Sequence, residues 1–238
     1  MFRLRGLPFV RACVWLLLAA VVGALSIGLV YGNPVPAPSA AGWSGDFAVM
    51  MIMMWPFVPM FLIQVHFFRG FWRRLGLWTY LAIFLEWLPV GLVLFALGDL
   101  LLRFEVAVSA PIVVLGVVAV AAGVALHGWT LKLLGLKATI GYTELKPESE
   151  SGKRTVITAG PFGVVRHPSY WAHTLIFSGV FLVTGVVAVG VIALVDFVLA
   201  YFVTTELEER ELIERFGEEY RRYRRVPKFF PKLHREQV

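Results

Sequence analysis

Apolar residues in this chain are grouped into long blocks that short polar stretches separate. Several blocks reach or exceed the roughly 20 residues that an α-helix needs to cross a bilayer. The pattern therefore predicts an all-α, polytopic integral membrane protein with about six transmembrane helices. The predicted spans are 12–31, 47–68, 75–97, 108–131, 169–187 and 190–206.

Four of these spans carry features that modify a simple helix. Pro56 and Pro59 lie inside the second span and should kink it, because proline removes a backbone hydrogen bond. The last two spans meet at a short turn around Gly185–Gly190, so they must form a tight hairpin in which one or both helices are short. The first span could be read as a signal peptide, but its apolar stretch is longer than usual, and we expect a retained helix.

Charge refines the topology. The chain is 58% hydrophobic and 16% charged, with a mean hydropathy of +0.75, whereas soluble domains carry about 25% charged residues. In the six-span arrangement every Lys and Arg except Arg103 falls on one side. By the positive-inside rule that side is the cytoplasm, and both termini lie there. The net charge of +6 therefore indicates topology and contact with anionic lipids, not a nucleic-acid partner.

The non-membrane parts are small. The longest, 132–168 and 207–238, cannot hold a doubly wound nucleotide-binding domain, and no Gly-rich fingerprint follows a strand. The lone Cys13 excludes a disulfide framework and a thiolate metal site. We therefore divide the chain into N-terminal membrane helices (1–131) and a C-terminal functional region (132–238). The oligomeric state stays open.

One polar string, GPFGVVRHPSYWAH (residues 160–173), directly precedes the fifth span. Pro168 suits the first turn of a helix, which places His167 at its N-terminus. Helix N-termini attract carboxylates and phosphates, and Arg166 and His167 add donors. The alternative is an interfacial anchor in which Arg166 snorkels and Tyr170 and Trp171 belong to an aromatic belt.

A second polar cluster follows the sixth span. Glu206–Arg210, Glu211–Arg215 and Glu218–Arg222 have the i,i+4 spacing of ion pairs on a solvated helix. Glu208 and Glu209 stand outside these pairs. On an ideal helix Glu208 shares one face with the residues at the inner mouth of the span. These are Tyr201, Thr204 and Thr205.

The two clusters together, GPFGVVRHPSY and the later EE, EL, FGEEY and VPKFFP elements, resemble the isoprenylcysteine carboxyl methyltransferase family. That family belongs to a wider group with phospholipid and membrane thiol methyltransferases. The resemblance covers roughly residues 140–232, and its two motifs occur in the expected order around a two-helix hairpin.

The resemblance implies a cytoplasmic pocket for S-adenosylmethionine and a lipidic or small apolar acceptor. It implies that His167 to Tyr170 hold the methionyl carboxylate and that Glu208 attracts the ammonium group. Phe162 and Tyr170 would offer ring faces to the adenine or the sulfonium. The implied cofactor contacts are Thr155, Val156, Ile157, Phe162, His167, Pro168, Ser169, Tyr170 and Glu208.

The chain departs from the family pattern at two positions. Thr204 stands where prenylcysteine enzymes have an arginine that engages the substrate carboxylate, and Ala172 replaces a glycine. The missing arginine counts against a carboxylate acceptor of that kind. Thr204 and Tyr201 remain candidates for acceptor contacts, and Glu208 and Tyr170 for catalytic roles.

A thiol or amine acceptor would also need a base. Glu86 in the third span and Asp196 in the sixth are candidates, because acids in a bilayer are costly unless they serve a function. The alternative is a structural hydrogen bond between helices. Asp196 should not share a wall with Glu208, since the two lie roughly 120° apart around an ideal helix.

A competing class is a haem- or metal-binding membrane protein. Four histidines map to the inner third of their spans or to a span's inner end, as such a site on facing helices would need. They are His66, His127, His167 and His173.

Overall fold

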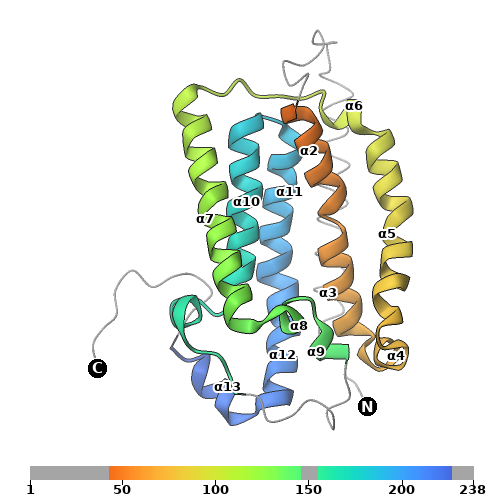
Figure 1. The fold of residues 1–238 in the computed structure, drawn as a ribbon, viewed down its shortest axis with the longest axis vertical. Helices are drawn as coiled ribbons and strands as arrows, with labels where there is room; N and C mark the ends of the chain where they lie inside the picture. The colour runs from red at the N-terminus through yellow and green to blue at the C-terminus, as the bar shows by residue number, and fades with distance from the viewer. Residues whose placement is uncertain (1–42, 146–154, 227–238) are drawn as a thin grey trace.

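The computed structural model of this chain describes residues 43–145 and 155–226. Within these residues the molecule is a bundle of long helices with most of the short helices gathered at one end (Figure 1). The described part contains one isolated bridge, between Glu105 and Val186, and no strand. The predicted all-α class is confirmed.

Four helical segments are long and apolar enough to cross a membrane: Ser44–Phe67, Trp78–Ala96, Ala110–Leu134 and Val187–Phe216. They correspond to the second, third, fourth and sixth predicted spans. The fifth is α10 (Pro168–Thr184), which has 17 residues and lies between its neighbours in the bundle (Figure 1). The chain is thus a polytopic membrane protein. The first predicted span lies outside the described residues.

The second span is broken into α2 (Trp43–Met54) and α3 (Phe57–Phe67). The interruption falls at Trp55 and Pro56, where proline cannot donate the next helical hydrogen bond. The predicted kink is therefore confirmed, and α5 (Trp78–Ala96) packs beside the kinked pair.

Glycines bring α7 (Ala110–Leu134) and α10 into close contact. A Cβ atom on Gly116 would lie 2.8 Å from the Gly179 carbonyl oxygen, and one on Gly179 would lie 2.6 Å from the Gly116 carbonyl oxygen. Gly123 similarly faces the carbonyl of Ala172. Small residues at such crossings let helix backbones approach within a membrane. This contact holds α10, and with it the polar string at its N-terminus.

Gly179→Ala is expected to destabilise the protein by about 1–3 kcal/mol, because the added methyl group overlaps backbone that cannot move away cheaply. Gly128→Ala is the matched control, since nothing lies within 4 Å of a Cβ at that helical position. Thermal unfolding in detergent measures both. Equal midpoints for the two variants would show that the close α7–α10 contact does not limit stability.

The last long helix has three parts: α11 (Val187–Leu199), a π-helical turn η3 (Ala200–Thr204) and α12 (Thr205–Phe216). The hydroxyl of Thr205 donates to the carbonyl oxygen of Ala200 at 2.6 Å, five residues back. The wide turn shifts the angular position of every residue that follows it.

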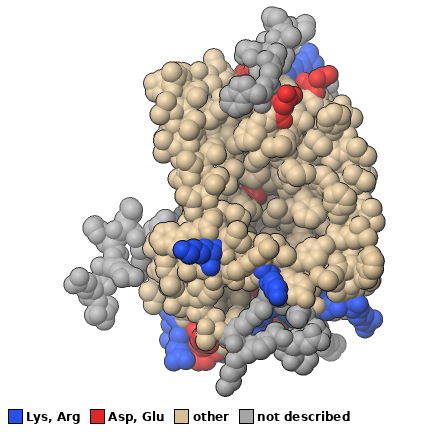
Figure 2. Space-filling model, in the orientation of Figure 1, with Lys and Arg blue, Asp and Glu red and all other residues tan. Residues whose placement is uncertain are grey.

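Short helices surround the lower end of α12 in Figure 1. They are α4 (Arg69–Leu75), α8 (Leu136–Thr139), α9 (Tyr142–Leu145), η2 (Gly160–Gly163) and α13 (Glu218–Tyr223), while α6 (Gly98–Leu101) lies at the opposite end. On the face in Figure 2, most Lys and Arg side chains gather toward this lower end, below a broad band with few charges. The polar string that precedes α10 is at the same end.

Candidate active site

His167 is the centre of a buried charged cluster. It precedes Pro168, the first residue of α10, and its side chain is 4% exposed. Its Nδ1 atom lies 3.1 Å from Glu208 Oε2, and its Nε2 atom lies 3.2 Å from Glu209 Oε1. Two consecutive glutamates of α12 thus contact the two nitrogens of one imidazole.

Tyr170 closes the cluster from the next turn of α10. Its hydroxyl donates to Glu208 Oε2 at 2.7 Å, and its ring stacks on His167 with centroids 5.5 Å apart. The Glu208 side chain remains 33% exposed, unlike that of His167. Among the three side chains of the cluster, that of Glu208 is the most exposed.

Glu209 is bound from several directions. Besides His167, it contacts Arg166 Nη1 at 2.9 Å and Arg224 Nη1 at 3.6 Å, and its side chain is 11% exposed. No charged residue stands at the i,i+4 spacing from Glu209, so its role is not predictable from the sequence. The sequence shows only that the Glu209 carboxylate lacks a partner on its own helix. Its partners in the structure, His167, Arg166 and Arg224, lie outside α12.

The charge of His167 follows from this geometry. Burial alone would lower the pKa of His167, but the carboxylates of Glu208 and Glu209 raise it to about 9. The ring is therefore an imidazolium at neutral pH, and both nitrogens donate hydrogen bonds.

The other predicted cofactor residues meet α13. The backbone N–H of Val156 donates to Glu219 Oε1 at 2.9 Å, and Tyr223 donates its hydroxyl hydrogen to the carbonyl oxygen of Phe162 at 2.9 Å. Phe162 in η2 and Pro168, the first residue of α10, are both buried. Thr155 is exposed and Ile157 is partly buried beside Val156.

Ser169 turns toward α7 instead. Its hydroxyl donates to Thr130 Oγ1 at 3.4 Å. Among the predicted cofactor residues, the structure therefore brings His167, Tyr170 and Glu208 into one cluster, and it joins Val156 and Phe162 through α13.

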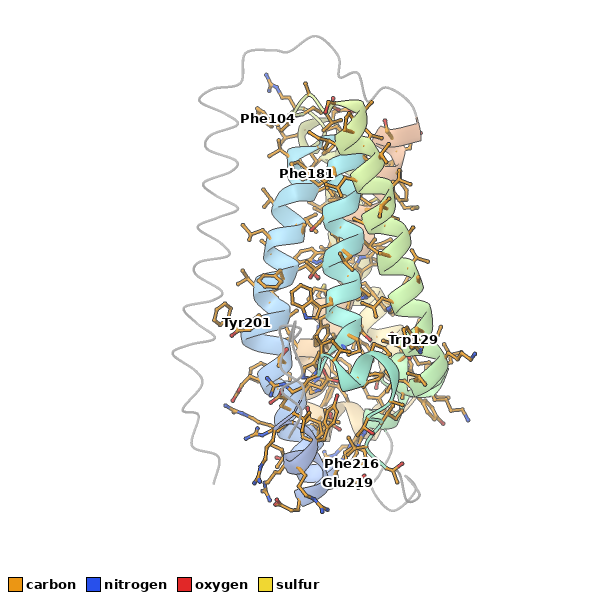
Figure 3. The ribbon with its side chains drawn as sticks, turned by 90° about the vertical axis from the view of Figure 1, so that its left-hand side faces the viewer. Phe104, Trp129, Phe181, Tyr201, Phe216 and Glu219 are labelled. Carbon is orange, nitrogen blue, oxygen red and sulfur yellow. The ribbon has the colours of Figure 1, made fainter. Side chains whose placement is uncertain are left out.

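Tyr201 lies elsewhere. It is 36% exposed, its ring stacks on Phe197 with centroids 6.3 Å apart, and it points away from the bundle (Figure 3). The π-helical turn η3 removes the regular spacing on which the expected shared face with Glu208 rested. The Thr204 side chain is not among those that the structure describes.

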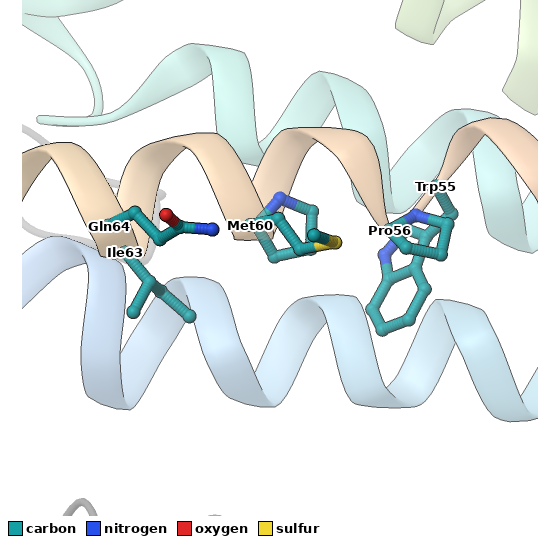
Figure 4. Close-up of a pocket in the computed structure, with 6 residues that line it drawn as sticks. Trp55, Pro56, Met60, Ile63 and Gln64 are labelled. Carbon is teal, nitrogen blue, oxygen red and sulfur yellow. The ribbon is translucent and has the colours of Figure 1, made fainter. Parts of the chain in front are cut away.

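The two membrane acids are also separate from the cluster. Asp196 accepts a hydrogen bond from Trp55 Nε1 at 2.8 Å, and Glu86 accepts one from Gln64 Nε2 at 2.7 Å. Asp196 is 8% exposed, whereas Glu86 is exposed on the described surface. Both donors line one open pocket of about 300 Å³ on the side of α2 and α3 that faces α11 (Figure 4).

The expected helical ion pairs are mostly present. Arg210 Nη2 lies 2.8 Å from Glu206, and Arg215 Nη2 lies 2.9 Å from Glu211. The pairing of Glu218 with Arg222 is corrected: Glu218 contacts Arg221, three residues on in α13, at 3.4 Å.

A second buried network was missed. Glu211 is only 3% exposed, and its Oε2 atom lies 3.3 Å from His66 Nε2. Arg69 reaches Glu214 at 2.8 Å. These contacts attach α3 and α4 to α12. Sequence spacing placed Glu211 on a solvated face because it cannot show that α3 covers that face.

The four inner histidines do not converge. His66 contacts Glu211, His167 contacts Glu208 and Glu209, and the rings of His127 and His173 lie 5.4 Å apart. Among the described residues, no group of three or more His, Cys, Asp or Glu could hold a metal ion. This separation counts against the haem or metal interpretation.

Fold and site together define a polytopic helical membrane protein with a buried charged cluster at the basic end of its bundle. Residues 111–219 match the phospholipid methyltransferase family. The matched segment runs from α7 into α13 and contains His167, Tyr170 and Glu208. The predicted resemblance to this superfamily is therefore confirmed.

One curated relative is the cobalt-zinc-cadmium resistance protein CzcN of Cupriavidus metallidurans, 34% identical over 106 residues. The aligned region covers 44% of this chain and 49% of the relative, so the match spans about half of that protein. No solved structure matches this chain.

Proposed function

We propose that this chain is an S-adenosylmethionine-dependent methyltransferase that acts on a lipidic or small apolar acceptor. The observation that supports the proposal is the cluster of His167, Tyr170 and Glu208 at the N-terminus of α10, inside the residues that match the phospholipid methyltransferase family. The basic residues at this end of the bundle suggest that the site faces the cytoplasm.

The donor set suits the two charged ends of a free amino acid. The first N–H groups of α10 would hold the methionyl carboxylate, since helix N-termini favour anions, and the buried imidazolium of His167 adds positive charge beside them. Glu208 is both negative and one-third exposed, so it would hold the ammonium group. Arg166 and Arg224 compensate the charge of Glu209, which leaves Glu208 as the accessible carboxylate.

The remaining residues would hold the nucleoside half. Phe162 and Tyr170 supply aromatic surface, and Thr155, Val156 and Ile157 supply a backbone segment that is bonded to α13 through Val156. When bound, S-adenosylmethionine supplies a sulfonium methyl group for direct displacement by the acceptor. The protein positions the two reactants and excludes water.

The pocket beside α3 is the proposed acceptor site. Its lining is almost entirely apolar and consists of Trp55, Pro56, Pro59, Met60, Ile63 and Gln64. Leu62 on the same helix packs against the buried pair Tyr170 and Ala200, so α3 lies next to the charged cluster. Under this proposal residues 1–131 receive the acceptor and residues 132–238 bind the cofactor, although the family match begins at residue 111.

The acids near the pocket set the chemistry that the site can perform. Glu86 and Asp196 are hydrogen-bonded to the pocket-lining residues Gln64 and Trp55, and either carboxylate is a candidate to accept a proton directly from a thiol or an amine. A carboxylate acceptor would need neither acid. Replacing Glu86 and Asp196 separately by their amides distinguishes these acceptor classes.

Met60→Trp is expected to lower methyl transfer by at least about tenfold, because the indole fills the pocket and displaces the acceptor. Binding of S-adenosylhomocysteine should stay within about twofold of wild type. Leu92→Trp on the exposed face of α5 is the control for a bulky change toward lipid. Transfer of tritium-labelled methyl groups into the lipid fraction measures the effect, and unchanged transfer in Met60→Trp rejects this acceptor site.

The direct test of the proposed function is calorimetric titration of the detergent-solubilised protein with S-adenosylhomocysteine. Saturable binding with one site per chain is expected. A folded protein that shows no binding would reject the methyltransferase assignment.

A further inference from the structure

Two parts of the candidate cofactor site are attached to α13. Glu219 accepts the hydrogen bond from the Val156 N–H, and Tyr223 donates to the Phe162 carbonyl oxygen, both at 2.9 Å. Tyr220 lies between these two anchoring residues in the sequence of the helix. It is 2% exposed, which makes it the buried residue of α13.

The hydroxyl group of Tyr220 lacks a hydrogen-bond partner among the described residues. Its ring lies against Tyr223 with centroids 5.6 Å apart, so the side chain is packed and not turned toward solvent. Buried hydroxyls in native proteins are nearly always paired, and leaving one unpaired is costly. A ligand that enters the site is a natural partner for such a group.

The electrostatic surroundings keep this hydroxyl a donor. Burial raises the pKa of Tyr220, and the negative charges of Glu209 and Glu208 raise it further. These same two carboxylates belong to the His167 cluster, and the end of α13 reaches that cluster directly, because Arg224 Nη1 lies 3.6 Å from Glu209.

We propose that the Tyr220 hydroxyl binds the ribose of the cofactor, donating a hydrogen bond to a sugar oxygen. The inference rests on the proposed function, which assigns the amino-acid half of the cofactor to His167 and Glu208. The nucleoside half must then extend away from those residues, toward Val156 and Phe162, and both of these are attached to α13. The ribose is the part of a nucleoside richest in hydroxyl groups, which can both accept and donate.

Tyr220→Phe tests this assignment because it removes only the hydroxyl group. The unfolding midpoint of the ligand-free protein should equal or exceed that of wild type, since the lost group has no internal partner. Affinity for S-adenosylhomocysteine should fall by about three- to tenfold, the range of one neutral hydrogen bond. Affinity for methylthioadenosine, which lacks the amino-acid half, should fall by the same factor.

Tyr223→Phe is the matched control on the same helix. Its hydroxyl is bonded within the protein, so its loss should lower the ligand-free unfolding midpoint by about 2 °C or more. A lowered ligand-free midpoint in Tyr223→Phe but not in Tyr220→Phe would show that the Tyr223 hydroxyl stabilises the fold and the Tyr220 hydroxyl does not.

The outcomes that overturn the proposal are distinct. Wild-type protein that binds neither ligand rejects the proposed function and the ribose contact together. Wild-type binding with unchanged affinity in Tyr220→Phe rejects the ribose contact alone. A loss confined to S-adenosylhomocysteine moves the hydroxyl to the amino-acid half, and a lowered ligand-free midpoint shows that Tyr220 has an internal partner.

Discussion

His167→Ala is expected to lower the free energy of unfolding by about 3 kcal/mol and to abolish measurable S-adenosylhomocysteine binding. The variant removes the cation between Glu208 and Glu209, and breaking a buried ion pair typically costs about 3–5 kcal/mol. The lower end applies because Glu209 keeps Arg166 and Glu208 is partly solvated. Thermal unfolding in detergent should show a midpoint about 6–12 °C below wild type.

His173→Ala on the same helix is the control for removing an imidazole. Its ring contacts His127 rather than a carboxylate in the described cluster. If His173→Ala is as unstable as His167→Ala, the loss of stability comes from the removed side-chain volume and not from the lost ion pairs. Retained S-adenosylhomocysteine binding in His167→Ala would remove His167 from the cofactor site.

The same charge predicts a pH dependence of stability. The pKa of His167 is raised from 6.5 to about 9 in the folded protein. The folded state therefore binds a proton that the unfolded state loses above pH 6.5, so the stabilisation is complete below that pH. It is lost progressively as pH rises to about 9. Unfolding midpoints measured from pH 6 to 9.5 should fall in wild type, and this component of the fall should be missing in His167→Ala.

Glu208→Gln is expected to weaken S-adenosylhomocysteine binding by about 2–3 kcal/mol, or roughly 30- to 150-fold. The amide keeps the size of the side chain but removes the charge that would hold the ligand ammonium. Methylthioadenosine has no ammonium group, so its affinity should change less than about threefold. Calorimetry with both ligands, at a temperature where the variant is folded, measures the difference.

Glu206→Gln is the control at an exposed position of the same helix. Glu206 pairs with Arg210 where both side chains are 61% exposed, outside the His167 cluster. Its replacement should change affinity for either ligand by less than about twofold. Equal weakening of both ligands in Glu208→Gln would mean that Glu208 acts through the fold instead of through the ammonium group.

The long helices were predictable because their signal is local. An apolar block of about 20 residues has one stable conformation in a bilayer, so the spans near 47–68, 75–97 and 108–131 were located within a few residues. The kink at Pro56 and the start of α10 at Pro168 were also local, since proline restricts its own backbone.

The partners of the charged residues were less predictable because they are set by contacts between distant segments. Helical spacing identified the exposed pair Glu206–Arg210 correctly, but it assigned Glu211 to a solvated face that α3 covers. The prediction that Tyr201 and Glu208 lie on one helical face has a different weakness, because it assumes regular α-helical spacing. The π-helical turn at Ala200–Thr204 changes the angle between residues before and after it. The sequence AYFVT has no pattern that predicts such a turn.

Residue order was sufficient to specify an all-α membrane protein, its kinked second span and the superfamily motifs around His167 and Glu208. Hydrophobic length and proline geometry are properties of neighbouring residues, and they need no knowledge of the fold. Tertiary packing was needed to show that Glu208 and Glu209 share one imidazole and that Val156 and Phe162 meet on α13. It was also needed to show that the Tyr220 hydroxyl is buried without an internal partner among the described residues. These features depend on how helices far apart in sequence come together, and that arrangement is a property of the whole bundle.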